Sequence, residues 1–64
     1  MNEVTNKIKT CCSDKNISAE ELSGRTGLSE EQIQLIISGD KIPSLSSLIK
    51  IARALGVRLG TFLD

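Results

Sequence analysis

Hydrophobic residues recur along this chain at the spacing of α-helices, and nowhere with the strict alternation of a half-buried strand. A first helix is predicted near residues 3–15, with an apolar stripe formed by Val4, Ile8, Cys11 and Cys12. An amphipathic helix is predicted over residues 45–55, with an inward face formed by Leu45, Leu48, Ile51, Ala52 and Leu55. The core is then expected to be closed, around a short helix near residues 59–63, by Val57, Leu59, Phe62 and Leu63.

Two serines predict the starts of two further helices in the middle of the chain. Ser18 is followed three residues later by Glu21, and Ser29 is followed three residues later by Gln32. In such a capping box the serine oxygen accepts from a backbone N–H of the first turn, and the third residue reaches back to the serine's own N–H. Gly27 can adopt the left-handed conformation that ends the first of these helices.

These signals predict helices over residues 19–26 and 30–38, joined by a turn of about three residues, which is a helix-turn-helix. Ile33, Ile36 and Ile37 are expected to face the core from the second of the two. In a DNA-binding helix-turn-helix, this second helix docks in the major groove. The predicted fold class is therefore all-α, with five helices near residues 3–15, 19–26, 30–38, 45–55 and 59–63.

The chain length allows one small domain, residues 1–64, whose core must be compact. No apolar run approaches the roughly 18 residues of a membrane helix, and no signal peptide is visible, so no membrane association is expected. The two cysteines, Cys11 and Cys12, are adjacent, which disfavours a disulfide between them and matches no zinc spacing. We therefore expect a reduced, cytoplasmic protein with no metal site and no cofactor.

The charge of the chain is balanced, with eight basic and eight acidic residues, whereas a DNA-binding domain on its own is usually basic. Residues 18–39 hold one basic and four acidic residues, a net charge of −3. Residues 40–64 hold four basic and two acidic residues, a net charge of +2. The acidic part of the chain is thus the helix-turn-helix itself.

The frame E-L-x-x-x-T-G-L-S-x-x-x-I-x-x-I-x-x-G, followed by P-S-L-x-x-L-x-x-I-A-x-A-L-G-V, extends from Glu21 to Val57, and the match around it covers residues 17–63 without an insertion. With this frame the chain resembles the phage repressor/Cro (XRE-like) helix-turn-helix family, whose domains have a compact five-helix repressor-like fold. The resemblance implies a sequence-specific DNA-binding domain of a bacterial transcriptional regulator that binds double-stranded DNA with its third helix in the major groove. It also implies an N-terminal position in a longer regulator that forms a homodimer through another domain. A natural 64-residue protein is the alternative.

Matching positions in the family also imply which residues touch DNA. Base contacts are implied at the start of the third helix and along it, from Ser29, Glu30, Glu31, Gln32, Gln34 and Leu35. Gln can pair with adenine, Glu can accept from the cytosine N4 amine, and Leu can pack on a thymine methyl group. Phosphate contacts are implied at helix starts and in the loop after the third helix, from Ser18, Ala19, Ser38, Lys41 and Ser44.

Most of these residues also have a purely structural interpretation. Glu30 and Glu31 lie in a first helical turn, where carboxylates are favoured by about 0.3–1 kcal/mol through the helix dipole. The serines are caps, and Gln32 is a capping partner. Leu35 either faces solvent or is partly buried. Gly24, inside the second helix, either lets another backbone approach closely or weakens that helix by about 1 kcal/mol.

Several positions depart from the family pattern. Ala19 stands where many relatives have a phosphate-binding glutamine, and Asp40 and Ile42 stand at loop positions that are often basic. Cys12 and Ile37 stand where relatives commonly form an ion pair between the first and third helices, a replacement that need not destabilise the fold. We therefore expect weak DNA binding by one domain and stronger binding by a tethered pair.

Other functions are less favoured. An enzyme is not expected, because the chain has no histidine and no tyrosine for acid–base chemistry at neutral pH. A thiol sensor is disfavoured because Cys11 and Cys12 fall on or near the buried stripe. The remaining alternative is a protein-interaction module of the same fold, with weak or no DNA binding. The balanced charge, the two outward glutamates and the apolar run Leu35-Ile36-Ile37 favour it.

Overall fold

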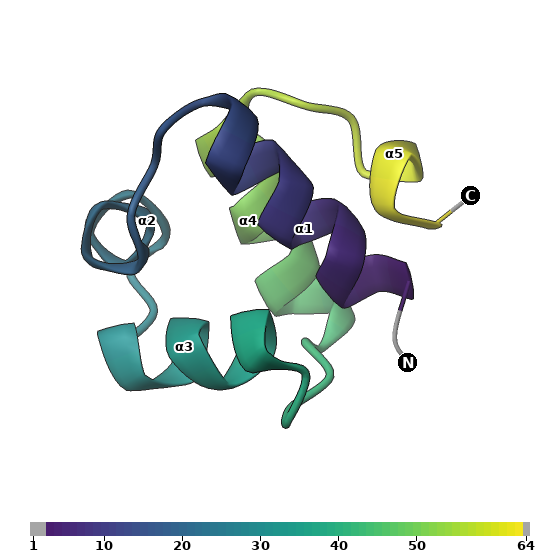
Figure 1. Cartoon of the computed structure of the whole chain (residues 1–64). Helices are drawn as coiled ribbons and strands as arrows, with labels where there is room; N and C mark the ends of the chain where they lie inside the picture. The colour runs from purple at the N-terminus through teal and green to yellow at the C-terminus, as the bar shows by residue number, and fades with distance from the viewer. Residues whose placement is uncertain (1–2, 64) are drawn as a thin grey trace.

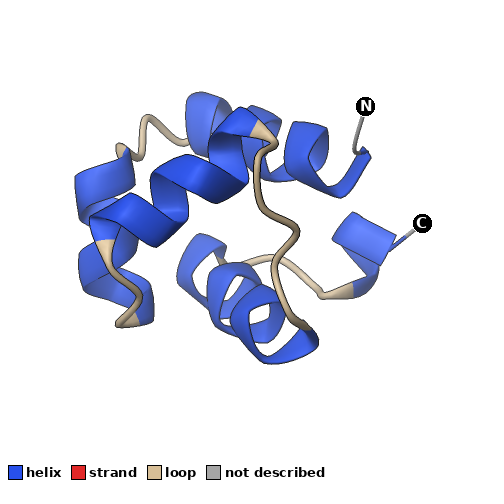
Figure 2. Ribbon diagram, turned by 90° about the horizontal axis from the view of Figure 1, so that it is seen from below, coloured by secondary structure: helices blue, strands red, loops and turns tan. Residues whose placement is uncertain are grey.

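A computed structural model describes residues 3–63, which form five helices and no strand. The helices are α1 (Glu3–Asp14), α2 (Ala19–Thr26), α3 (Glu30–Ser38), α4 (Leu45–Leu55) and α5 (Gly60–Leu63). α1 packs against α3, α4 and α5, while α2 packs against α3 and α4 (Figures 1 and 2). The result is a compact unit of 26 × 24 × 22 Å, which confirms the all-α fold class and the predicted order of elements.

The predicted bounds of the three middle helices are confirmed, and the first and last helices are each one residue shorter than predicted. α1 ends at Asp14 because Asn16 adopts a left-handed backbone conformation, with φ of 55°. Asparagine is one of the few residues that tolerate this conformation. The turn is closed by the N–H of Ile17, which donates to the carbonyl of Cys12 at 2.9 Å and returns the chain to the core.

Each of the three middle helices begins at a serine in extended conformation whose Oγ accepts from a backbone N–H of the first turn. The three oxygen–nitrogen distances are 3.1, 3.1 and 3.2 Å, for Ser18 with Glu21, Ser29 with Gln32 and Ser44 with Ser47. An apolar residue precedes each serine, and another follows it four positions later. This is the spacing of a hydrophobic staple, which fixes the direction in which the chain enters a helix.

The second half of the predicted capping boxes is wrong. Glu21 does not reach back to Ser18, because its carboxylate pairs with Arg25 one turn later, at 2.6 Å. The side chain of Gln32 makes no hydrogen bond to any residue within 3–63 and is half-buried. The serine oxygens alone therefore cap these helices.

Glycines end the same three helices in left-handed conformation, with φ of 80° at Gly27, 89° at Gly39 and 70° at Gly56. A side chain with a Cβ is strained at such angles, so the short helices end at defined positions. Gly24 has a different character. A Cβ built there meets no atom within 4 Å, so no neighbouring backbone approaches it closely, and glycine only weakens α2.

The core combines residues from all five helices and includes the single aromatic side chain. Its fully buried side chains are Ile8, Leu22, Ile33, Ile51 and Phe62. Cys12 belongs to this core, and Ile37 packs against it from α3, so the positions where relatives commonly form an ion pair are apolar here.

Three predicted core positions are wrong or incomplete. Leu45 is 62% exposed at the first position of α4, whereas Pro43, two residues earlier, is buried. Leu63 is 58% exposed, because a helix as short as α5 buries one side chain, and that side chain is Phe62. On α1 the buried stripe includes Thr5, while Val4 is only half-buried.

Candidate nucleic-acid interface

Two side chains of α2 hold the turn that positions α3. The hydroxyl of Ser23 donates to the carbonyl of Leu28 in the turn. The hydroxyl of Thr26 donates to the carbonyl of Leu22 at 2.8 Å, and its oxygen accepts from the N–H of Leu28 at 3.2 Å. Ser23 and Thr26 together satisfy the carbonyl and the N–H of Leu28 and so hold the turn against the end of α2. None of these bonds involves a residue that α3 presents to solvent.

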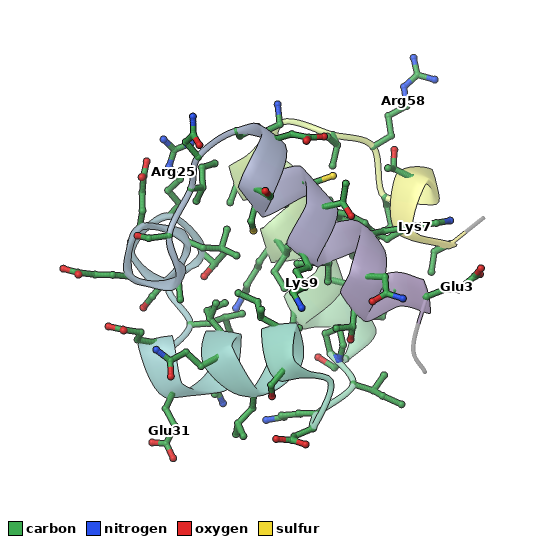
Figure 3. The ribbon with its side chains drawn as sticks, viewed as in Figure 1. Glu3, Lys7, Lys9, Arg25, Glu31 and Arg58 are labelled. Carbon is green, nitrogen blue, oxygen red and sulfur yellow. The ribbon has the colours of Figure 1, made fainter. Side chains whose placement is uncertain are left out.

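α3 lies along one edge of the molecule, with one side in the core and the other facing solvent (Figure 1). Ile33 and Ile36 are buried, and Ile37 is half-buried. The sequence-predicted base contacts lie mostly on the outer side. The exposed ones are Ser29, Glu30, Glu31, Gln34 and Leu35, while Gln32 is half-buried. The side chain of Glu31 points away from the body of the domain (Figure 3).

Hydrogen bonds within α3 engage several of these side chains. The Nε2 of Gln34 donates to the carboxylate of Glu30, one turn earlier, at 3.2 Å. Ser29 is the cap described above, so its oxygen is already an acceptor. Leu35 is 38% exposed, which resolves its orientation: it faces outward with part of its side chain covered. Glu31 makes no hydrogen bond or ion pair within the part of the chain that the structure describes.

The serines among the sequence-predicted phosphate contacts form hydrogen bonds within the domain. The oxygens of Ser18 and Ser44 cap their helices, and the hydroxyl of Ser44 donates to Ser47 at 3.1 Å. The hydroxyl of Ser38 is within hydrogen-bonding distance of the Leu35 carbonyl, at 3.0 Å, and of the Asp40 carboxylate, at 3.1 Å. Three of the five candidates therefore already use their hydroxyl groups to hold the fold.

The other two candidates differ from each other. Ala19 is half-buried and packs against the core, so it can offer only its backbone N–H. Lys41 is exposed in the turn after α3, where its backbone N–H donates to the carbonyl of Leu35 at 3.1 Å. Its ammonium forms no ion pair among residues 3–63 and is the one full positive charge in the candidate set.

Two exposed apolar residues lie in and just after the loop between α3 and α4, and the sequence pattern did not predict that both would be exposed. Ile42 is 73% exposed in the loop before α4, and Leu45 is 62% exposed at the first position of that helix. The exposure of Ile42 could be suspected from its place in a loop. That of Leu45 could not, because its spacing from Leu48 and Ala52 is that of an inward residue.

Other kinds of chemistry find less support in the described residues. A shallow cavity of about 320 Å³ lies between α1 and α5, away from α3, and is lined by Asn6, Lys7, Thr10, Cys11 and Thr61. Burial, and then the neighbouring Cys11, raises the pKa of the Cys12 thiol, so the reactive thiolate is disfavoured there. Residues 3–63 hold no group of three or more cysteine or carboxylate side chains close enough to share a metal ion. No helix among them is both long and apolar enough to cross a membrane.

Comparison with known proteins identifies the family. Residues 8–62 match the sequence profile of the helix-turn-helix family, and the chain belongs to it. An HTH-type transcriptional regulator of Sinorhizobium fredii (strain NBRC 101917 / NGR234), named y4dL and described as uncharacterized, is 34% identical over 56 residues. That alignment covers 88% of this chain and 29% of the relative, so the chain spans less than a third of the relative's length. No solved structure matches the chain.

Proposed function

We propose that this member of the helix-turn-helix family is the sequence-specific DNA-binding domain of a bacterial transcriptional regulator, with α3 entering the major groove. One observation carries the proposal. The solvent-facing side of α3 holds most of the candidate base contacts, while Ile33 and Ile36 attach its other side to the core. The membership of the family and the similarity to a transcriptional regulator support the same function.

The dimensions of α3 suit this role. Nine residues extend about 13 Å, and an α-helix with its side chains is about 10–12 Å across, which fits a major groove about 12 Å wide. The serine caps leave the first two backbone N–H groups of α2 and α4 without partners inside their helices. Those groups, together with the Lys41 ammonium, are the donors for phosphate oxygens in this proposal.

The charges on α3 make the binding weak for a single domain. Glu30 and Glu31 oppose the phosphates, and α3 carries no basic residue. Each phosphate contact that is missing removes about 0.9 from the slope of log affinity against log salt. Two domains held together gain effective concentration, which raises avidity by about 100-fold or more. We therefore propose that the domain is N-terminal in a longer cytoplasmic regulator and works as a homodimer assembled through a segment outside this chain.

An NMR titration of the isolated domain with a mixed-sequence duplex at low salt tests the interface. Chemical-shift changes are expected at residues 29–44 and at the first turns of α2 and α4, and not in α1 or α5. A fusion of two copies through a flexible linker should bind a palindromic duplex specifically at physiological salt, while the single domain does not. Nanomolar binding by the single domain would contradict the weak-domain part of the proposal.

A second candidate function is a protein-interaction module. The exposed Ile42 and Leu45, beside an acidic α3, are the observation that favours it, because neither side chain can neutralise a phosphate. The same titration separates the two functions. If no duplex shifts residues 29–44 even at low salt, the interaction module is the better description of the domain.

A further inference from the structure

We infer that Glu31 is the residue through which α3 selects a cytosine in its DNA site, an inference that rests on the function proposed above. Its carboxylate accepts a hydrogen bond from the cytosine N4 amine in the major groove. Glu31 then discriminates chiefly by exclusion, because any base that offers it no donor leaves a carboxylate desolvated and unpaired.

The hydrogen bonds of α3 single out Glu31 from its neighbour Glu30. The carboxylate of Glu30 already accepts from Nε2 of Gln34 at 3.2 Å. Glu31 has no such partner within residues 3–63, is exposed, and projects from the outer side of the helix (Figure 3). It lies at the second position of α3, in the part of a recognition helix that contacts base edges. Glu31 is therefore the carboxylate that meets DNA with both oxygens unused.

The chemistry of the base edges makes cytosine the matching partner. Guanine presents two acceptors in the major groove, N7 and O6, and thymine presents the O4 acceptor and a methyl group, so both repel a carboxylate or leave it unpaired. Adenine presents an amine, but its N7 acceptor lies beside it and faces the second carboxylate oxygen. Cytosine presents its N4 amine with no acceptor of its own in the groove.

Leu35 strengthens this discrimination. It lies one turn after Glu31, on the same side of α3, and is 38% exposed, so its apolar surface would cover the space beside the carboxylate once α3 is in the groove. α3 carries no basic side chain that could neutralise Glu31 in the complex. A carboxylate that loses its water on binding, and that has no basic residue on its own helix, depends on the base amine for its hydrogen bond, so a wrong base is rejected strongly.

A binding selection with the 64-residue chain, from a library of randomised duplexes in about 20 mM salt to favour weak binding, tests the inference. The selected duplexes should share a C·G pair. Replacing that cytosine by N4-methylcytosine, which removes the amine hydrogen from the groove, should weaken binding about tenfold. Replacing the paired guanine by 7-deazaguanine, which removes the N7 acceptor, should leave binding unchanged.

The variant Glu31→Ala, which removes both carboxylate oxygens, tests the residue, and Glu20→Ala is the matched control. Glu20 has the equivalent place, the second position of α2, is also exposed, and carries the same charge. Both variants should bind DNA more tightly through the loss of a negative charge. Only Glu31→Ala, which leaves no acceptor at position 31, should lose the preference for the C·G pair and the sensitivity to N4-methylcytosine. Circular dichroism confirms that both variants are folded.

The outcomes separate this inference from the function on which it rests. Specific binding that weakens with 7-deazaguanine, or that keeps its C·G preference in Glu31→Ala, overturns the inference and leaves the DNA-binding function standing. Binding to no duplex by the wild type and both variants overturns both. Loss of the preference in Glu31→Ala but not in Glu20→Ala establishes Glu31 as the selecting residue.

Discussion

Arg25 of α2 donates a hydrogen bond from Nη1 to the backbone carbonyl of Ala54, 3.4 Å away, near the end of α4. Its Nη2 lies 2.6 Å from Oε2 of Glu21, one turn earlier on α2. The carbonyl groups in the last turn of a helix lack partners within it, and a cation is favoured there. Arg25 therefore attaches the first helix of the helix-turn-helix to the end of α4, in addition to the buried Leu22.

Replacing Arg25 with methionine tests this attachment. The side chains of Arg25 and Glu21 are 49% and 46% exposed, so solvent screens the pair, and the loss should be only about 0.5–1 kcal/mol in the free energy of unfolding. Urea denaturation measures the change, and Arg58→Met, at another exposed arginine, is the control. Because the pair between Arg25 and Glu21 is ionic, high salt should reduce the difference in stability between wild type and variant. Equal losses of stability in Arg25→Met and Arg58→Met would mean that the contacts of Arg25 contribute nothing.

Gly24→Ala should stabilise the domain by about 1 kcal/mol, because alanine has the higher helix propensity and a Cβ at this position meets no atom within 4 Å. Thermal unfolding followed by circular dichroism measures the change. Gly27→Ala is the matched comparison, since it also adds one methyl group in open space, but at a φ of 80°. It should destabilise the domain. A loss of stability in Gly24→Ala would contradict the open space around position 24.

Thr5→Val should raise the free energy of unfolding by about 1 kcal/mol. The Oγ1 of Thr5 is buried without a hydrogen-bond partner among residues 3–63, and an unsatisfied buried polar atom costs about 1–3 kcal/mol. Valine has nearly the same shape and removes that cost. Chemical denaturation of this variant beside Thr10→Val, at an exposed position of the same helix, isolates the effect of burial. A destabilised Thr5→Val would show that the hydroxyl has a favourable interaction.

The stability of the domain should fall at alkaline pH through Cys12. Its pKa is raised in the folded protein, so the folded state keeps the thiol protonated at pH values where the unfolded chain ionises it. This contribution to stability is fully present below the ordinary thiol pKa of about 8.5 and is lost as the pH rises through the raised pKa. Unfolding measured at several pH values should show a smaller decrease in Cys12→Ala than in Cys11→Ala. A smaller decrease in Cys11→Ala than in Cys12→Ala would contradict the prediction and assign the effect to Cys11.

The helices could be predicted because their ends are encoded locally. Ser18, Ser29 and Ser44 begin helices, and Gly27 and Gly39 end them, whatever the rest of the chain does. Which of two possible hydrogen-bond partners a side chain takes could not be predicted in the same way. The carboxylate of Glu21 can reach either a backbone N–H or a guanidinium, and only the position of Arg25 in the folded helix decides between them.

The outer side of α3 was also predictable, because helical period alone separates Ile33 and Ile36 from Glu30, Glu31 and Gln34. Positions at helix ends were not. Leu45 and Leu63 have the spacing of core residues, but periodicity carries no information on where neighbouring elements stop. Gln34 pairs with Glu30, which leaves Glu31 as the carboxylate of α3 with no hydrogen bond to residues 3–63. This pairing likewise depends on side-chain rotamers that a pattern of residue types does not specify.

The bonds that hold the α2–α3 turn involve Ser23, Thr26 and Leu28, and none of them involves an outward residue of α3. The architecture and the recognition surface can therefore mutate separately. Substitutions at positions 30, 31, 34 and 35 can accumulate over generations with little effect on folding, so duplicated copies of such a gene can diverge to new targets while keeping one scaffold.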